Sequence, residues 1–220
     1  MACARIFRRP NRSPRLSGWA RVALLSLSLL ACQTPRAHGV DTSAEHAIVV
    51  DHRTGTILFE KAARVPIYPA SMTKMMTTYM VFDALAREAL SMQDRFAVSE
   101  KAWRKGGSKM FVREGTQVSV RDLLYGIIVQ SGNDASIVVA EGMAGSEAAF
   151  ARRMNEKARA LGMRDSRFRN ATGWPDAKHV TTARDLAILV RRLIQDFPQY
   201  YPIFAEHHFT YNGIKQRNRN

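Results

Sequence analysis

The stretch YPASMTKMMTTYM, residues 68–80, decides the fold of this chain because it joins a helix start to an almost uncharged apolar run. Pro69 introduces the segment, and a helix is predicted from about Ser71 to Ala89. Apolar residues fall on most sides of that helix, which predicts that it is buried. They are Met72, Met75, Met76, Tyr79, Met80, Phe82 and Leu85. A lysine, Lys74, therefore needs an explanation in this setting.

Lys74 follows Ser71 by three residues, and side chains at this spacing are neighbours on a helix. Ser71 is expected in the first turn, where free N–H groups and the helix dipole favour negative charge. Burial is expected to lower the pKa of Lys74, and a neutral lysine beside a serine is a general base. The alternative is structural, because Ser-x-x-Lys arises about once by chance in such a chain and a buried lysine can extend to solvent.

A second cluster, Ser131-Gly132-Asn133, is expected in a tight turn between two helices. Taken alone, a serine in a turn is most often a helix cap. Together with Ser71 and Lys74 it fits a reactive site. Ser131 could relay a proton, and the Asn133 carboxamide could hold a substrate amide.

The remaining pattern predicts a hairpin at each end of the body and helices between them. Gly55 and the pair Asn212-Gly213 supply the turn signals, while Ser119, Ser146 and Thr182 are expected helix caps. The expected elements are a hairpin over 47–60, helices from Ser119, over 134–143, 146–161 and 183–196, and a final hairpin around 212–213. About four strands beside a helical cluster suggest an antiparallel sheet that is unfinished where the chain stops.

The first 39 residues contain seven arginines and no acidic residue, followed within them by an apolar run from Val22 to Cys32. Eleven residues span only about 16 Å as a helix, too short for a bilayer core. Residues 1–39 are therefore predicted to be a signal peptide. Three outcomes stay open: cleavage near Ala37 to Gly39, lipidation at Cys32, and retention as an anchor.

The charge of the chain does not predict a nucleic-acid partner. Seven of the 14 net positive charges lie in the leader, so residues 40–220 carry a net charge of +7. Their lysines and arginines are interspersed with 19 acidic residues. The sequence contains no nucleic-acid-binding motif to give this charge a target. The only cysteines are Cys3 and Cys32, so disulfides are not expected to stabilise the body. His46, His52, His179, His207 and His208 lack metal-ligand spacing and are expected on the surface or in loops.

With these motifs in hand, the chain resembles the penicillin-binding serine D-Ala-D-Ala carboxypeptidases, whose motifs are Ser-x-x-Lys, Ser-x-Asn and Lys-Thr-Gly. The stretch PASMTKMMT resembles the nucleophile helix of that family, and QSGNDA resembles its second motif. Further segments resemble family landmarks in order: GSKMF, LGM, ATGWPD, TTARDLA and FTYNGIKQRNRN. The likeness runs from about His46 to the last residue.

The resemblance implies an α/β protein with a β-lactamase/transpeptidase-like fold, in which an antiparallel sheet accompanies a helical cluster. It implies that Ser71 attacks a cell-wall peptide ending in D-Ala-D-Ala and that Lys74 accepts the serine proton. Ser131 would pass a proton to the departing D-alanine, and Asn133 would orient the substrate. No cofactor or metal is expected. β-Lactams would acylate Ser71, and the protein would work in the periplasm or cell envelope, with membrane attachment through the leader, Cys32 or a later segment.

One family motif is missing, because no Lys-Thr-Gly follows Ser131. Arg53-Thr54-Gly55 precedes the nucleophile and is interpreted as part of the first turn. We therefore expect residues 40–220 to be the N-terminal part of the catalytic domain, truncated before the Lys-Thr-Gly strand and nearly inactive alone. Two alternatives remain: a serine β-lactamase, disfavoured because residues 164–174 lack a glutamate, and a non-catalytic binder of cell-wall peptides.

Overall fold

The computed structural model describes residues 40–219, so the predicted signal peptide over residues 1–39 lies outside the described residues. Every element named below belongs to one compact unit that begins at Thr42. Its strands are β1 Ala47–Val50, β2 Ile57–Lys61, β3 Arg95–Ala97, β4 Gln117–Ser119, β5 His208–Tyr211 and β6 Ile214–Arg217. Its helices are η2 Ala70–Met72, α2 Thr73–Ala86, α3 Glu100–Arg104, α4 Val120–Gln130, α5 Asn133–Ala144, α6 Glu147–Leu161, α7 Ala183–Asp196 and η3 Tyr201–Ala205.

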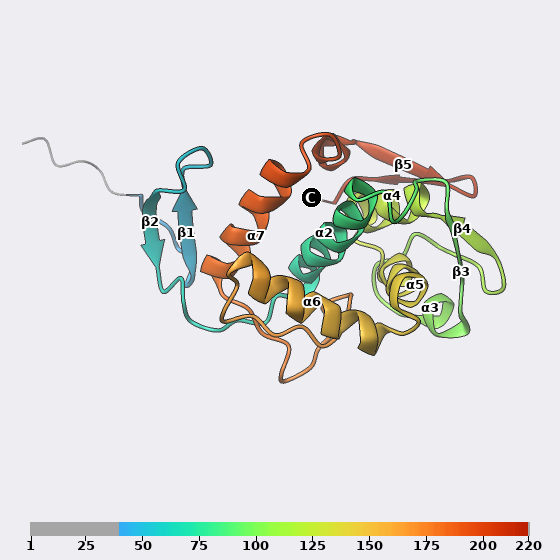
Figure 1. Cartoon of the computed structure of the whole chain (residues 1–220), viewed down its shortest axis with the longest axis horizontal. Helices are drawn as coiled ribbons and strands as arrows, with labels where there is room; N and C mark the ends of the chain where they lie inside the picture. Colours follow the sequence, from blue (N-terminus) through green and yellow to red (C-terminus); the bar gives the residue numbers. More distant parts are fainter. Residues whose placement is uncertain (1–39, 220) are drawn as a thin grey trace, which may run out of the picture. The chain divides into compact units, whose positions relative to one another are not determined.

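The helix α2 is the centre of this unit, with α4, α5, α6 and α7 packed around it (Figure 1). Its buried side chains include Met76, Tyr79 and Phe82, as the all-round apolar pattern predicts. Phe197, which follows α7, lies 5.0 Å from the Tyr79 ring and 5.7 Å from the Phe82 ring, centroid to centroid. Met72 departs from the prediction, because it is 42% exposed.

The boundaries of the predicted helix also change. Residues 70–72 form a 3₁₀ turn, and the α-helix begins only at Thr73 and ends at Ala86 rather than Ala89. A 3₁₀ turn is common at the start of an α-helix because the first backbone groups have no partner there. Similarly, α5 begins at Asn133, one residue before the predicted start.

The helix caps follow the sequence prediction. The hydroxyls of Ser119, Ser146 and Thr182 accept hydrogen bonds from backbone N–H groups three residues later, at the starts of α4, α6 and α7. A fourth cap, Ser99, begins the short helix α3, which was not predicted.

Both predicted hairpins are confirmed, as β1–β2 and β5–β6. Their turns contain the residues with positive φ that tight turns need, with Gly55 at +78° in the first and Asn212 and Gly213 at +47° and +77° in the second. A third antiparallel pair, β3–β4, was not predicted. In residues 40–219 each pair forms its own two-stranded sheet, so the terminal hairpins do not join into the single sheet that the sequence suggested.

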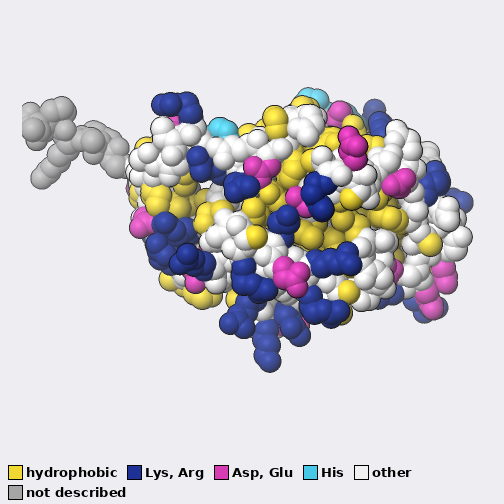
Figure 2. Space-filling model, in the orientation of Figure 1, with side chains coloured by type: hydrophobic (Ala, Val, Ile, Leu, Met, Phe, Trp, Pro, Cys, Tyr) yellow, Lys and Arg dark blue, Asp and Glu magenta, His cyan; other side chains and the backbone are white. Residues whose placement is uncertain are grey.

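Charged side chains of both signs share the face of the molecule seen in Figure 2, where basic groups lie beside acidic groups and apolar patches. In the part of the chain that the structure describes, no helix is long and apolar enough to cross a membrane.

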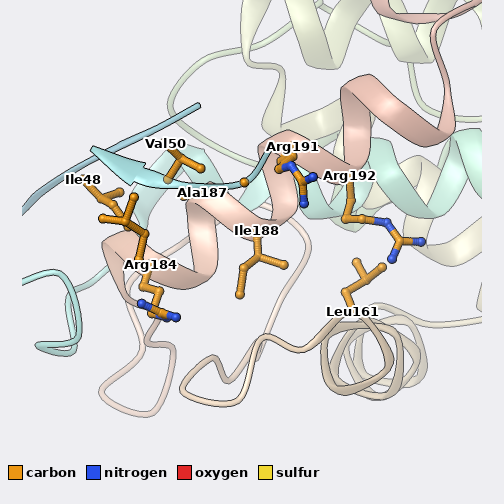
Figure 3. A pocket seen from close by; sticks show the side chains of 10 residues that line it. Ile48, Val50, Leu161, Arg184, Ala187, Ile188, Arg191 and Arg192 are labelled. Atoms are coloured by element: carbon orange, nitrogen blue, oxygen red, sulfur yellow. The ribbon is translucent and has the colours of Figure 1, made fainter. Parts of the chain in front are cut away.

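A cavity of about 310 Å³ lies between the first hairpin, α7 and the end of α6 (Figure 3). Ile48 and Val50 of β1 line it with Ile188 of α7, and Arg184, Arg191 and Arg192 border it. On the same hairpin, Leu58 remains 64% exposed. None of the four candidate site residues Ser71, Lys74, Ser131 and Asn133 lines this cavity.

Candidate active site

Ser71 lies at the start of the central helix with its side chain exposed. Pro69 and Ala70 precede it, and Ala70 has a φ of +46°, a backbone conformation that residues with a Cβ rarely adopt. The Met72 N–H bonds to the Pro69 carbonyl at 3.0 Å and closes the turn around Ser71. The N–H group of Ser71 lies in this first turn, where helical N–H groups lack a partner within the helix. The serine therefore presents its hydroxyl, and a nearby backbone donor, to solvent.

Lys74 lies one turn below and is 4% exposed. Its Nζ is 3.2 Å from Ser71 Oγ and 2.9 Å from the carbonyl oxygen of Thr172. Burial lowers the pKa of Lys74 to about 8, although the carboxylate of Asp134 acts in the opposite direction. At pH 7 roughly a tenth of such lysines are neutral, about 300 times the fraction expected at a pKa of 10.5.

The carbonyl of Thr172 also orients the lysine. A neutral amine has one lone pair and two N–H groups, and a carbonyl oxygen only accepts hydrogen bonds. When an N–H of Lys74 is directed at Thr172, the lone pair is free to accept the proton of Ser71. The pair is therefore arranged for general-base activation of a serine.

Residues 171–173 run along the start of α2 and the turn before it. The Thr77 hydroxyl donates to the carbonyl of Ala171 at 2.8 Å. Gly173 has a φ of +80°, and a Cβ at this position would overlap the carbonyl of Ala70. The sequence offered ATGWPD only as a family landmark, with no role for its residues. Gly173 was the one sequence signal of a close backbone approach, but the residue that it approaches, Ala70, is about a hundred residues away.

Ser131 ends α4 in the left-handed conformation, with φ of 56° and ψ of 37°. Together with Ser71 and Lys74 it lines a cavity of about 190 Å³. The final hairpin supports this helix end, because Gln130 donates to the carbonyl of Arg217 and the Arg219 N–H donates to Val129 at 3.0 Å. The structure thus brings three of the four predicted site residues to one cavity.

Asn133, the fourth predicted residue, is not among the residues that line that cavity. It begins α5, is 7% exposed, and its Nδ2 donates to the carbonyl of Gly106 at 2.9 Å. This bond uses one of the two N–H donors of the carboxamide, and Oδ1 is the group that can accept from a substrate N–H.

Asp134 supports the loop beside Asn133, a role that the sequence did not reveal. Its buried carboxylate accepts N–H bonds from Met110 at 3.0 Å, Phe111 at 2.9 Å and Val112 at 3.2 Å. An aspartate at a helix start usually caps its own helix, whereas this side chain mainly organises a segment more than twenty residues earlier.

Trp174 and Lys105 border the same region and were also missed. The Lys105 ammonium lies 3.6 Å from the centre of the Trp174 ring, a cation–π geometry, and burial lowers the pKa of this lysine. A Cβ at Gly107 would come within 3.5 Å of Trp174 and 2.7 Å of Asn133 Nδ2. The ring therefore connects the loop around Gly107 to the loop around Gly173.

His179 agrees with the sequence prediction of a surface or loop position. It lies in a loop and is 2% exposed, with its Nε2 2.9 Å from Thr73 Oγ1. His52, His207 and His208 are exposed and His46 is partly exposed. Among residues 40–219, no cluster of three His, Cys, Asp or Glu side chains is arranged to hold a metal ion.

Comparison with known proteins assigns this chain to a family. The model of a peptidase family described as D-alanyl-D-alanine carboxypeptidase matches residues 32–220. The chain belongs to this family. A D-alanyl-D-alanine carboxypeptidase of Escherichia coli, DacC, is 41% identical over 194 residues, which are 86% of this chain and 48% of that protein.

Solved structures agree with the family and with the predicted fold class. DacD of Francisella tularensis has 38% identity and a TM-score of 0.80, covering 88% of this chain and 47% of that one. Penicillin-binding protein 5 of Haemophilus influenzae has 38% identity and a TM-score of 0.79, covering 82% and 53%. The penicillin-binding, transpeptidase-like fold is therefore confirmed. The chain spans about half the length of the curated relatives it matches.

Proposed function

We propose that this protein is the catalytic part of a serine-type D-Ala-D-Ala carboxypeptidase that removes the terminal D-alanine from peptidoglycan pentapeptides. The observation that carries the proposal is the contact of 3.2 Å between Ser71 Oγ and a lysine Nζ that is nearly excluded from solvent. Family membership narrows the chemistry to acyl transfer from a peptide ending in D-Ala-D-Ala.

In the proposed reaction, Ser71 Oγ attacks the carbonyl carbon between the two D-alanines while Lys74 accepts the hydroxyl proton. The oxygen that becomes negative is stabilised in part by the N–H of Ser71. Ser131 passes a proton to the nitrogen of the departing D-alanine, and Asn133 Oδ1 accepts from a substrate N–H. The resulting ester on Ser71 is then hydrolysed by water, which frees the enzyme.

The proposed partners follow from the same site. Stem peptides ending in D-Ala-D-Ala are the substrates, and β-lactams acylate Ser71 as inhibitors. We place the protein in the periplasm or cell envelope, as the basic and apolar leader indicates. Membrane attachment through that leader, a lipid at Cys32 or a later segment belongs to the same proposal.

We further propose that the catalytic domain continues beyond residue 220 into a strand carrying Lys-Thr-Gly. The exposed apolar side chain of Leu58 and the open cavity beside β1 provide a surface on which additional strands could pack. Release of D-alanine from a pentapeptide should be compared between residues 40–220 and a longer form. Equal rates would contradict the idea that residues 40–220 are incomplete.

The main test is labelling of the full-length protein with a fluorescent penicillin. We expect one label, at Ser71, lost in Ser71→Ala and retained in Ser43→Ala, an exposed serine that serves as the matched control. The labelled protein should release penicillin slowly, and the unlabelled protein should liberate one D-alanine from each pentapeptide. Rapid turnover of penicillin would instead indicate a β-lactamase, and absence of labelling would indicate a non-catalytic binder.

A further inference from the structure

His179 is enclosed beside the nucleophile helix, and the proposed reaction does not use it. Its ring stands edge-on to Phe168, with 5.7 Å between ring centroids. Nε2 is 2.9 Å from the hydroxyl oxygen of Thr73, and Nδ1 accepts the backbone N–H of Arg169 at 3.3 Å. Both ring nitrogens therefore have a partner, one on the helix and one on the loop.

These two contacts determine the protonation state of the ring. A backbone N–H can only donate, so Nδ1 must carry a lone pair and cannot carry a proton. In the neutral ring the proton is then on Nε2, which donates to Thr73 Oγ1. A protonated ring would point an N–H at the N–H of Arg169. The observed geometry thus fits one tautomer of neutral histidine.

Thr73 connects His179 to the reactive pair, because it lies between Ser71 and Lys74 in the chain. The loop that contains His179 also supplies the Thr172 carbonyl that orients Lys74. The loop therefore holds the first two turns of α2 at three points: His179 at Thr73, Thr172 at Lys74 and Ala171 at Thr77. Loss of the contact at Thr73 would free the turn that carries the nucleophile.

We propose that neutral His179 is a positioning residue that holds Thr73, and with it the Ser71–Lys74 pair, in reactive geometry, and that protonation of its ring releases this hold. The inference rests on the proposed acylation of Ser71 and adds an acid limit to that reaction. His179 does not touch the reacting atoms and acts through Thr73.

The charged groups around the ring act on the pKa of His179 in opposite directions. Burial, the largest effect, lowers the pKa of His179, while Asp176 and Glu147 raise it and Arg169 lowers it. Arg169 also faces Asp176 at 3.8 Å, which offsets part of both influences. His179 borders a cavity of about 420 Å³ that residues 173–177 also line, so protons can reach the buried ring.

The test is the pH dependence of Ser71 acylation by a fluorescent penicillin in the full-length protein. Lys74 must be neutral to act, so the logarithm of the rate should rise with a slope of about 1 below pH 8. A second group that must be neutral steepens this slope to about 2 at a lower pH, here below 6.5. Circular dichroism at each pH would show that the protein remains folded.

His179→Gln separates the two roles of the ring. A glutamine amide can donate to Thr73 and accept from Arg169 but does not titrate, so acylation should stay within about threefold at pH 8 and the slope should remain about 1 at all lower pH values. His207→Gln, at an exposed histidine, is the matched control and should keep the steeper acid limb. His179→Ala should acylate about tenfold or more slowly even at pH 8.

A second pair of variants tests the same contact from the helix. Thr73→Val removes the hydroxyl and should slow acylation about tenfold at pH 8, whereas Thr73→Ser should stay within about threefold. A steeper acid limb that persists in His179→Gln, or normal rates in Thr73→Val, would overturn the positioning role alone. Absence of Ser71 labelling at every pH would overturn the proposed function and this inference together.

Discussion

Replacement of Lys74 by methionine should change stability in a direction that depends on pH. The folded protein holds the pKa of Lys74 at about 8, because burial disfavours the charged amine, whereas the unfolded chain has the ordinary value of 10.5. This difference corresponds to roughly 3 kcal/mol of lost stability. Methionine has a similar length and no charge, so Lys74→Met removes this penalty.

The sign follows from proton binding. Below pH 8 the lysine is charged in both states, and the penalty is complete. Between pH 8 and 10.5 only the unfolded chain keeps the proton, so the stability of the wild type rises with pH until the penalty is gone. The variant also loses the bonds to Ser71 and Thr172, together about 2 kcal/mol. Lys74→Met should therefore be about 1 kcal/mol more stable at pH 7 and about 2 kcal/mol less stable at pH 10.5.

Urea unfolding followed by tryptophan fluorescence at several pH values between 7 and 10.5 measures this difference. Lys178→Met, at an exposed lysine, is the matched control and should differ from the wild type by a constant amount. A Lys74→Met difference that stays constant within about 0.5 kcal/mol over this range would refute the reasoning. In the same variant, acylation of Ser71 should fall by about 10²-fold or more, because the proposed general base is gone.

Three further substitutions probe the support of the site. Asp134→Asn should lower the free energy of unfolding by about 3 kcal/mol, because an amide cannot accept all the backbone N–H groups that the carboxylate accepts. A loss below about 1 kcal/mol in chemical denaturation would contradict this. Gly173→Ala should slow acylation by penicillin at least about tenfold, because the new Cβ would overlap Ala70. Gly145 also has a positive φ but has open space around it, so Gly145→Ala should leave the acylation rate unchanged. Tyr79→Phe should cost about 1 kcal/mol of stability through loss of its bond of 2.6 Å to Asp196, and a thermal melt unchanged from the wild type would count against that bond.

Local signals explain which parts of the fold were predictable. A serine or threonine before a helix and an Asn-Gly pair in a turn act within a few residues, and the caps and both terminal hairpins followed them. The pair β3–β4 was missed because its strands have three residues each and lie about twenty residues apart. Short strands of this kind are defined by pairing and burial, not by their own pattern.

The candidate site likewise contains residues that local sequence signals could predict and residues that they could not. Ser71 and Lys74 could be proposed as a pair because their spacing places them on one helix turn, and Ser131 and Asn133 because they share one turn of the chain. The residues that support them reach across the sequence, as Thr172 does to Lys74 and His179 to Thr73. No periodicity in one sequence connects positions about a hundred residues apart. The buried state of His179 therefore became visible only in the structure.

The left-handed conformation of Ser131 has a consequence for protein engineering. The residue that ends a helix in this conformation is most favourably glycine, because any side chain is strained there. A search that rewards thermal stability alone would therefore be drawn to Ser131→Gly and would delete the hydroxyl proposed to transfer the proton. Stabilised forms of this protein should be selected with a penicillin-labelling step, so that the less stable residue is kept where the proposed chemistry requires it.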